Sequence, residues 1–213
     1  MTTRRSVLLG AVAGLTATAG CLEFALGTAP LETEATTVTV ADGALAETEY
    51  EVSRSDRTER SYTVTVAGQP REIEATCHVS EYRKRLSVGP LEDEYLGTFG
   101  VISAPRTELF GRTSHPLEGL DDRRLVADLQ SEYDRFETFE RVGTDAVRVL
   151  GDRREVAVHR AEAVHSGESI DVSLHVLSLD HGEDRIDGVG VHPTSLSGER
   201  QRILSLFERI QHG

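Results

Sequence analysis

The second half of the chain contains four strand-like segments in immediate succession, at about residues 138–149, 154–165, 170–179 and 185–192. Short turns separate them, and strands joined by short turns pair antiparallel, because a parallel crossover needs a dozen or more residues. Upstream, residues 62–66 and 72–82 show the same period-2 alternation, and Phe99 marks a further strand that Pro105 ends. The sequence therefore predicts an antiparallel β-sheet.

Helical patterns interrupt the strands. The clearest helix is predicted over residues 121–136, where one stripe holds Leu125, Val126, Leu129, Tyr133 and Phe136. A last helix is expected over 198–211 with Ser197 as its N-cap, and a short one through 44–48 with Asp42 as its cap. Strands in succession with interspersed helices indicate class α+β, an antiparallel β-sheet with helices packed on it, in a single domain.

The N-terminus has the pattern of an export signal. Thr3-Arg4-Arg5 is a twin-arginine start, and an uncharged stretch over 6–20 follows that is too short to span a bilayer. It ends in Ala19-Gly20-Cys21, which has the form of a lipidation motif. We therefore expect residues 1–20 to be a twin-arginine lipoprotein signal peptide, 21–36 a tether lipidated at Cys21, and 37–213 the domain. The protein would be exported and anchored by lipid to the outer face of the cell membrane.

The charge balance is strongly acidic. The full chain has a formal net charge of -13, and loss of Arg4 and Arg5 with the signal leaves -15. Lys84 is the only lysine, and this skew is typical of proteins adapted to high salt, where carboxylates hold water and cations and repulsion is screened within ~3 Å at 1 M. The acidity argues against a nucleic-acid partner, which needs a basic surface.

The two cysteines do not support a disulfide framework. If Cys21 carries lipid, Cys77 has no partner within the chain. Because Cys77 lies in an alternating strand pattern, we interpret it as a small buried residue.

Motifs for nucleotide, nucleophile or zinc chemistry (P-loop, Gly-x-Ser-x-Gly, His-Glu-x-x-His, Cys-x-x-Cys) do not occur, and no cofactor is predicted. The histidines of the last strands are the remaining candidates, and the position of each hairpin turn predicts which residues they face across the sheet. A loop at Gly167-Glu168 sets His159 and His165 on an apolar side and Glu162 opposite Ser173.

A next turn at residues 181–184, with Asp180 opposite Arg185, makes His175 and His192 diagonal neighbours, ~7 Å apart at Cα and in line with Glu162. Two histidines and a carboxylate suit a divalent metal or acid–base chemistry. A slip of one residue would reverse the faces, and Arg160 would repel a cation. We therefore interpret Glu162, His175 and His192 as ordinary polar side chains on an exposed surface, and we assign no catalytic residue or metal ligand.

Two other charged segments are predicted to have structural and not functional roles. The acidic stretch 180–184 is a solvated hairpin turn, since it lacks the 12-residue pattern of a calcium loop. The run Arg83-Lys84-Arg85 is expected to pair with local carboxylates.

Thr3-Arg4-Arg5, the Cys21 motif, Tyr82-Arg83-Lys84 and the stretch 172–193 resemble a family of haloarchaeal twin-arginine lipoproteins whose shared domain has no known function. That resemblance implies a location and a halophilic context, with no site residues to carry over. The order of elements in the second half is also similar to the PsbP-like and Mog1-like α/β sandwich, which implies an assembly or binding module.

Three hypotheses follow. The first is a membrane-anchored extracytoplasmic lipoprotein that binds a ligand or an envelope protein partner, or assists assembly, without catalysis. The second is a lipid-tethered hydrolase or metal-dependent enzyme that uses Glu162, His175 and His192. The third is a structural envelope protein.

Overall fold

The computed structural model describes residues 23–109 and 111–213. The predicted export and lipidation residues Arg4, Arg5 and Cys21 lie outside the described residues. In chain order the described elements are β1 (Leu31–Glu34), β2 (Val38–Val40), α2 (Asp42–Thr48), β3 (Glu51–Val66), β4 (Gln69–Val88), β5 (Leu91–Pro105), β6 (Thr107–Leu109), β7 (Arg112–Ser114), α3 (Asp122–Asp128), β8 (Arg135–Phe136), β9 (Glu140–Val149), β10 (Asp152–His165), β11 (Glu168–His181), β12 (Asp184–Pro193), α4 (Ser197–Glu208) and β13 (Ile210–His212).

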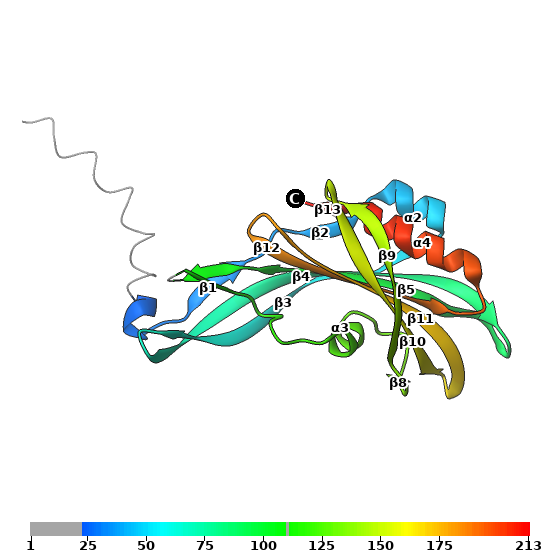
Figure 1. The fold of residues 1–213 in the computed structure, drawn as a ribbon, viewed down its shortest axis with the longest axis horizontal. Helices are drawn as coiled ribbons and strands as arrows, with labels where there is room; N and C mark the ends of the chain where they lie inside the picture. Colours follow the sequence, from blue (N-terminus) through cyan, green and yellow to red (C-terminus); the bar gives the residue numbers. More distant parts are fainter. Residues whose placement is uncertain (1–22, 110) are drawn as a thin grey trace, which may run out of the picture.

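One curled nine-stranded sheet organises the molecule (Figure 1). Its order is β1-β4-β5-β12-β11-β10-β8, with β3 added beside β4 and β9 beside β10. All pairs are antiparallel except β1 with β4. The predicted antiparallel sheet with packed helices is thus present, but the chain is richer in β-structure than class α+β suggests, because β3 and β4 have 16 and 20 residues.

The hairpin registers decide which side chains share a face. The β11–β12 prediction is confirmed, with Asp180 opposite Arg185. The predicted β10–β11 turn at Gly167-Glu168 is wrong by one residue, because the turn is Ser166-Gly167. Both turn residues have positive φ (52° and 84°), as this kind of two-residue hairpin turn requires. The pairing therefore slides by two residues, which keeps every side chain on its predicted face but changes its neighbour.

Helices α3 and α4 are shorter than predicted, whereas α2 begins two residues earlier than predicted. The 121–136 prediction is wrong beyond α3: Asp121 caps the helix at the Arg124 N–H, and the chain leaves the helix at Leu129. The Leu129 carbonyl oxygen lies over Gly100 of the sheet. A Cβ added at Gly100 would be only 2.1 Å from that oxygen, so the end of the helix packs closely on the sheet at a position that has no side chain. The stripe residues Tyr133 and Phe136 are buried, but from a loop and β8.

The caps of the other helices also differ from the prediction. The last helix stops at Glu208, after which β13 pairs with β2. Its N-cap is Leu196 and not Ser197, and neither Leu196 nor Ala41, the N-cap of α2, makes a side-chain capping bond.

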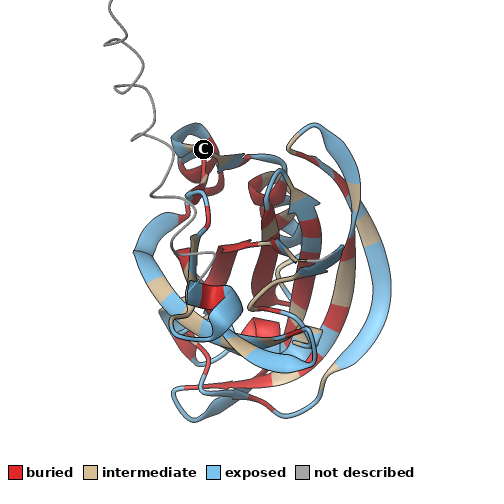
Figure 2. Cartoon of the chain, turned by 90° about the vertical axis from the view of Figure 1, so that its left-hand side faces the viewer, coloured by how far each residue is buried: buried red, intermediate tan, exposed pale blue. Residues whose placement is uncertain are grey.

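The sheet buries both faces in its centre, as the red segments of Figure 2 show. One core lies on the α3 side and includes Cys77, Ile102, Val126, Leu174 and Val191. The other lies under α2 and α4 and includes Tyr82, Phe99, Leu177, Ile203 and Phe207. Cys77 has no exposed surface, and burial raises the pKa of its thiol to about 11, so its interpretation as a small buried residue is confirmed.

Candidate functional site

The structure brings together two of the three residues that the predicted hairpin turns placed in line. His175 on β11 and His192 on β12 have their Nε2 atoms 3.2 Å apart. Glu162 does not join them, because the shifted register pairs it with Asp171 and not with Ser173. Within the described parts of the chain, no group of three or more His, Cys, Asp or Glu residues could hold a metal ion.

His159 and His165 lie on the opposite side of the sheet, as predicted, facing α3 and the loop after it. His159 Nε2 is 2.7 Å from Asp122 Oδ2, and His165 Nδ1 is 2.7 Å from the Glu132 carbonyl oxygen. Both side chains are buried, and each makes one hydrogen bond, to α3 or to the loop after it.

The face that carries His175 and His192 was expected to be exposed, and that expectation is wrong. His175 is 0% and His192 3% exposed, since α4 covers the sheet there. The sequence missed this because the two strands and α4 meet only in the folded chain.

The two imidazoles meet end to end. Their ring centroids are 5.3 Å apart while the facing nitrogens are only 3.2 Å apart, so the nitrogens lie between the rings. His192 Nδ1 is 2.9 Å from the Pro193 carbonyl oxygen, which needs an N–H there. His192 Nε2 is then the acceptor, and the His175 Nε2–H donates to it, an assignment made from the network.

This leaves His175 Nδ1 without a hydrogen and without a hydrogen-bond partner, facing Asp145 Oδ2 at 3.6 Å. Arg200 of α4 holds the Asp145 carboxylate, with its Nε donating to Oδ2 at 3.1 Å. Burial, and secondly His192, lowers the pKa of His175 to about 4, and burial also lowers the pKa of His192. The pair is therefore neutral near pH 7 and covered, so the arrangement can respond to acid but offers a substrate no access.

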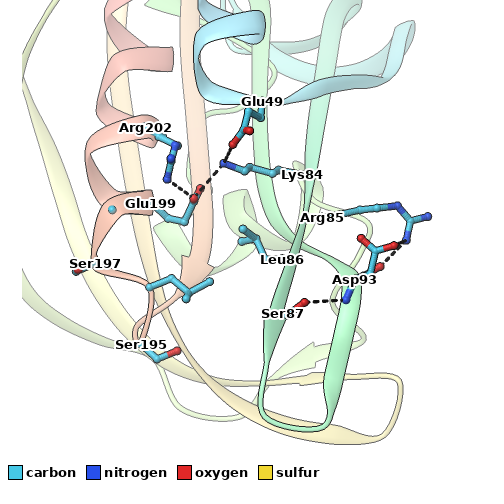
Figure 3. A pocket seen from close by; sticks show the side chains of 12 residues that line it. Glu49, Lys84, Arg85, Leu86, Ser87, Asp93, Ser195, Ser197, Glu199 and Arg202 are labelled. Carbon is cyan, nitrogen blue, oxygen red and sulfur yellow. Dashed lines mark hydrogen bonds and ion pairs between the residues drawn. The ribbon is translucent and has the colours of Figure 1, made fainter.

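An open cleft of about 580 Å³ lies between the β4–β5 turn and the start of α4 (Figure 3). We call it the α4 cleft. Its lining combines three cations with three carboxylates: Lys84, Arg85, Arg202, Glu49, Asp93 and Glu199. Their formal charges cancel, so the α4 cleft is locally neutral in an acidic protein.

Lys84, the only lysine, is the centre of the α4 cleft and is 7% exposed. Its Nζ donates to Glu199 Oε1 at 3.1 Å and to the Thr48 carbonyl at 3.0 Å, and Glu49 Oε2 lies 3.0 Å away. Arg202 donates to the same Glu199 oxygen at 2.7 Å, and Figure 3 shows Glu199 between the two cations. The predicted pairing of the 83–85 basic run with local carboxylates is thus confirmed for Lys84.

The same holds for the flanking arginines, where Arg83 pairs with Glu51 and Arg85 with Asp93. Glu199 is 115 residues away from Lys84 in the chain, and its role was not found from the sequence. The one hint in the sequence that this position is special is that Lys84 is a single lysine in a chain with 22 arginines.

The Tyr50 hydroxyl and Glu199 Oε2 are both buried beside Lys84, and the hydroxyl lies close enough to the Glu199 carboxylate to interact with it. Burial, and secondly the charge of Glu199, raises the pKa of Tyr50 well above its usual value. Tyr50 and Glu199 therefore belong to one buried polar cluster around Lys84.

Of the helices that the structure describes, none combines the length and the hydropathy needed to cross a membrane. No curated protein matches the chain with significant similarity. Residues 37–211 match a family model described as a domain of unknown function, DUF6517, and the match begins where the sequence predicts the domain to begin. The chain therefore belongs to the DUF6517 family.

Proposed function

We propose that the protein is a membrane-anchored extracytoplasmic lipoprotein whose domain is a binding module, with the α4 cleft as its binding surface. The anchoring rests on the twin-arginine start at Arg4 and Arg5 and on Cys21 after Ala19-Gly20. The binding role rests on one observation: the buried Lys84–Glu199 ion pair in the lining of an open cleft.

Stability does not account for that pair. Removing two charges from water costs several kcal/mol per ion, and apolar residues of similar volume often make a protein more stable. Lys84 and Glu199 have side chains only 7% and 4% exposed, so they bear most of that cost. Recognition of a ligand is a reason to keep buried charges in such a place.

The chemistry of the α4 cleft favours a small polar ligand without net charge. Its volume of about 580 Å³ suits a small molecule, and its cations and carboxylates cancel. The first turn of α4, which has no side-chain cap, offers N–H groups to an anionic group. The lining carboxylates, exposed Glu49 and Asp93 together with Glu199 beneath them, offer acceptors to a cationic donor. A zwitterion such as a free amino acid carries both groups.

The enzymatic alternative gains no support from the geometry. Its three residues do not converge, because Glu162 faces Asp171 and the two histidines are covered by α4. A protein partner in the envelope stays an alternative occupant of the same surface, and the acidity of the chain argues against nucleic acid.

Two experiments test the proposal. Cys21→Ser should move the mature protein from the membrane fraction to the medium, or leave the precursor uncut, and Arg4→Lys with Arg5→Lys should block export because lysine lacks the planar guanidinium fork. Unchanged membrane association with normal processing of Cys21→Ser would contradict the anchoring.

For the α4 cleft, free amino acids should raise the melting temperature of the full chain in molar salt, while acetate and choline, each with a single charge, should not. Glu199→Gln should abolish the shift. Glu137→Gln, at an exposed ion pair with Arg135, is the matched control and should keep it. A shift that survives in Glu199→Gln, or the absence of any shift in the wild type, would refute a zwitterion site.

A further inference from the structure

The segment next to the predicted lipid site is packed on the domain, although the sequence suggested a tether over 21–36. Phe24 is 4% exposed and joins Val66 and Ile73 in a small core, and β1 pairs with β4. Residues 23–36 therefore follow the surface of the domain and do not form a free linker.

Hydrogen bonds fix the first turn of this segment. The Thr28 N–H donates to the Glu23 carbonyl at 2.9 Å and the Gly27 N–H to the Phe24 carbonyl at 3.0 Å, which is the pair of bonds that ends a helix at a left-handed glycine. Gly27 has φ of 75°, and a Cβ there would lie 3.0 Å from the guanidinium carbon of Arg71.

Arg71 closes the contact from the domain side. Its Nη2 donates to the Ala25 carbonyl at 2.9 Å and its Nε to the same oxygen at 3.3 Å. We call residues 23–28, together with the adjoining β3–β4 turn at 66–69, the anchor end.

Chain length then limits how far this end can lie from a lipid on Cys21. Only Leu22 separates Cys21 from Glu23, and these two residue steps span at most about 7 Å of extended chain. Leu26, 66% exposed, is one of the most exposed large apolar side chains of the described residues, and it lies in the docked turn. One exposed leucine is ordinary on a surface, but Leu26 follows Cys21 by only five residues, so an acyl chain on Cys21 would lie within its reach.

The α4 cleft lies at the other end of the molecule. In Figure 1 the anchor end is at the left, and the β4–β5 turn and the start of α4 are at the right. Strand β4 runs between them, and the 13 residues from Arg71 to Lys84 span roughly 40 Å at ~3.3 Å per residue.

We propose that the anchor end lies directly on the lipid surface, with Leu26 in the interface, and that the docked turn holds the α4 cleft away from the membrane. The occupant is a bilayer surface, and the inference rests on the proposed lipid at Cys21. The protein then presents its cleft to molecules outside the cell and not to the lipid headgroups.

Site-specific fluorescence tests this orientation. Leu26→Cys places a thiol at the anchor end, and Ser195→Cys places one at the exposed rim of the α4 cleft. Cys77 is fully buried and should not compete for the label. Each variant, lipidated and labelled with an environment-sensitive dye, is placed in phosphatidylglycerol–phosphatidylcholine vesicles that contain spin-labelled lipid. Quenching should be strong at Leu26→Cys and absent at Ser195→Cys.

The measurements distinguish a failure of the proposed anchoring from a failure of the proposed orientation. Mass spectrometry and vesicle flotation report the lipid on Cys21. If the lipid is absent, the proposed anchoring and this inference both fail. If the lipid is present but Leu26→Cys is not quenched, or Ser195→Cys is quenched equally, the orientation is overturned while the anchoring stands.

Gly27→Ala tests the role of the docked turn, because an added methyl group meets Arg71 at a strained φ. It should release the domain to tilt, so that a label at Ser195→Cys becomes quenched. Gly43→Ala is the matched control, since its Cβ meets nothing within 4 Å, and it should keep the wild-type pattern. If Gly27→Ala also keeps that pattern, the docked turn does not set the orientation.

Discussion

Acid should destabilise this fold through one buried imidazole, that of His175. Its pKa is lowered from 6.5 to about 4 in the folded chain, chiefly by burial under α4. The unfolded chain therefore binds a proton first as the pH falls. The stability that His175 contributes is fully present above about pH 6.5 and is lost progressively as the pH falls toward 4. A shift of about 2.5 units at 1.36 kcal/mol per unit corresponds to about 3 kcal/mol.

The charges that face His175 act in both directions. Asp145 at 3.6 Å favours the protonated ring, whereas His192, Arg200 and His159 oppose it. Because these charges act in opposite directions, burial remains the dominant cause of the lowered pKa of His175. His192 has its pKa lowered in the same direction, so the pair should lose stability together, with His175 supplying the larger share.

The assay is guanidinium denaturation at closely spaced pH values between 7 and 4. His175→Gln keeps an N–H donor for His192 but removes the titration, so its free energy of unfolding should fall by about 3 kcal/mol less than that of the wild type over this range. The imidazole signals of His175, followed by NMR, should titrate near pH 4. Equal pH slopes in the two proteins, or titration of His175 near 6.5, would refute the reasoning.

Three further predictions concern packing and charge. Lys84→Met should cost about 3 kcal/mol because it leaves Glu199 buried without its lysine, and adding Glu199→Leu should recover most of that loss in denaturant titrations; a single variant as stable as the wild type would contradict this. Gly190→Ala would bring a methyl group to 2.3 Å from Ile203 of α4 and should cost about 1–3 kcal/mol by thermal melting, whereas Gly43→Ala should not destabilise. Lowering molar salt to ~0.1 M should lower the melting temperature, because a net charge of -15 over residues 21–213 is then poorly screened, and equal melting temperatures would show that repulsion is unimportant.

Local patterns predicted well those parts of the fold that local geometry governs. The alternation of apolar residues located β9 to β12 to within a few residues, and the β11–β12 register followed from its turn. The β10–β11 register was wrong by two because Ser166 and not Glu168 takes positive φ in the turn. Each strand kept its face, since a slip of two preserves the alternation.

The helix prediction over 121–136 failed for a different reason. Tyr133 and Phe136 do have helical spacing from Leu129, and all three are buried. The chain leaves the helix at Leu129, whose carbonyl lies over Gly100, and Tyr133 donates its hydroxyl to the Leu96 carbonyl at 2.6 Å. These partners come from β5, so no window of the sequence around 121–136 contains them.

The sequence by itself determined the antiparallel hairpins, the faces of their strands, the burial of Cys77 and the acidic charge balance, because each depends on neighbours in the chain or on composition alone. Only the tertiary structure decided that α4 covers His175 and His192, that Lys84 meets Glu199, and that residues 23–28 dock on Arg71. Those contacts join segments far apart in the chain, and burial, which sets both the pKa of His175 and the cost of the Lys84 charge, exists only once the sheet has curled and its helices have packed.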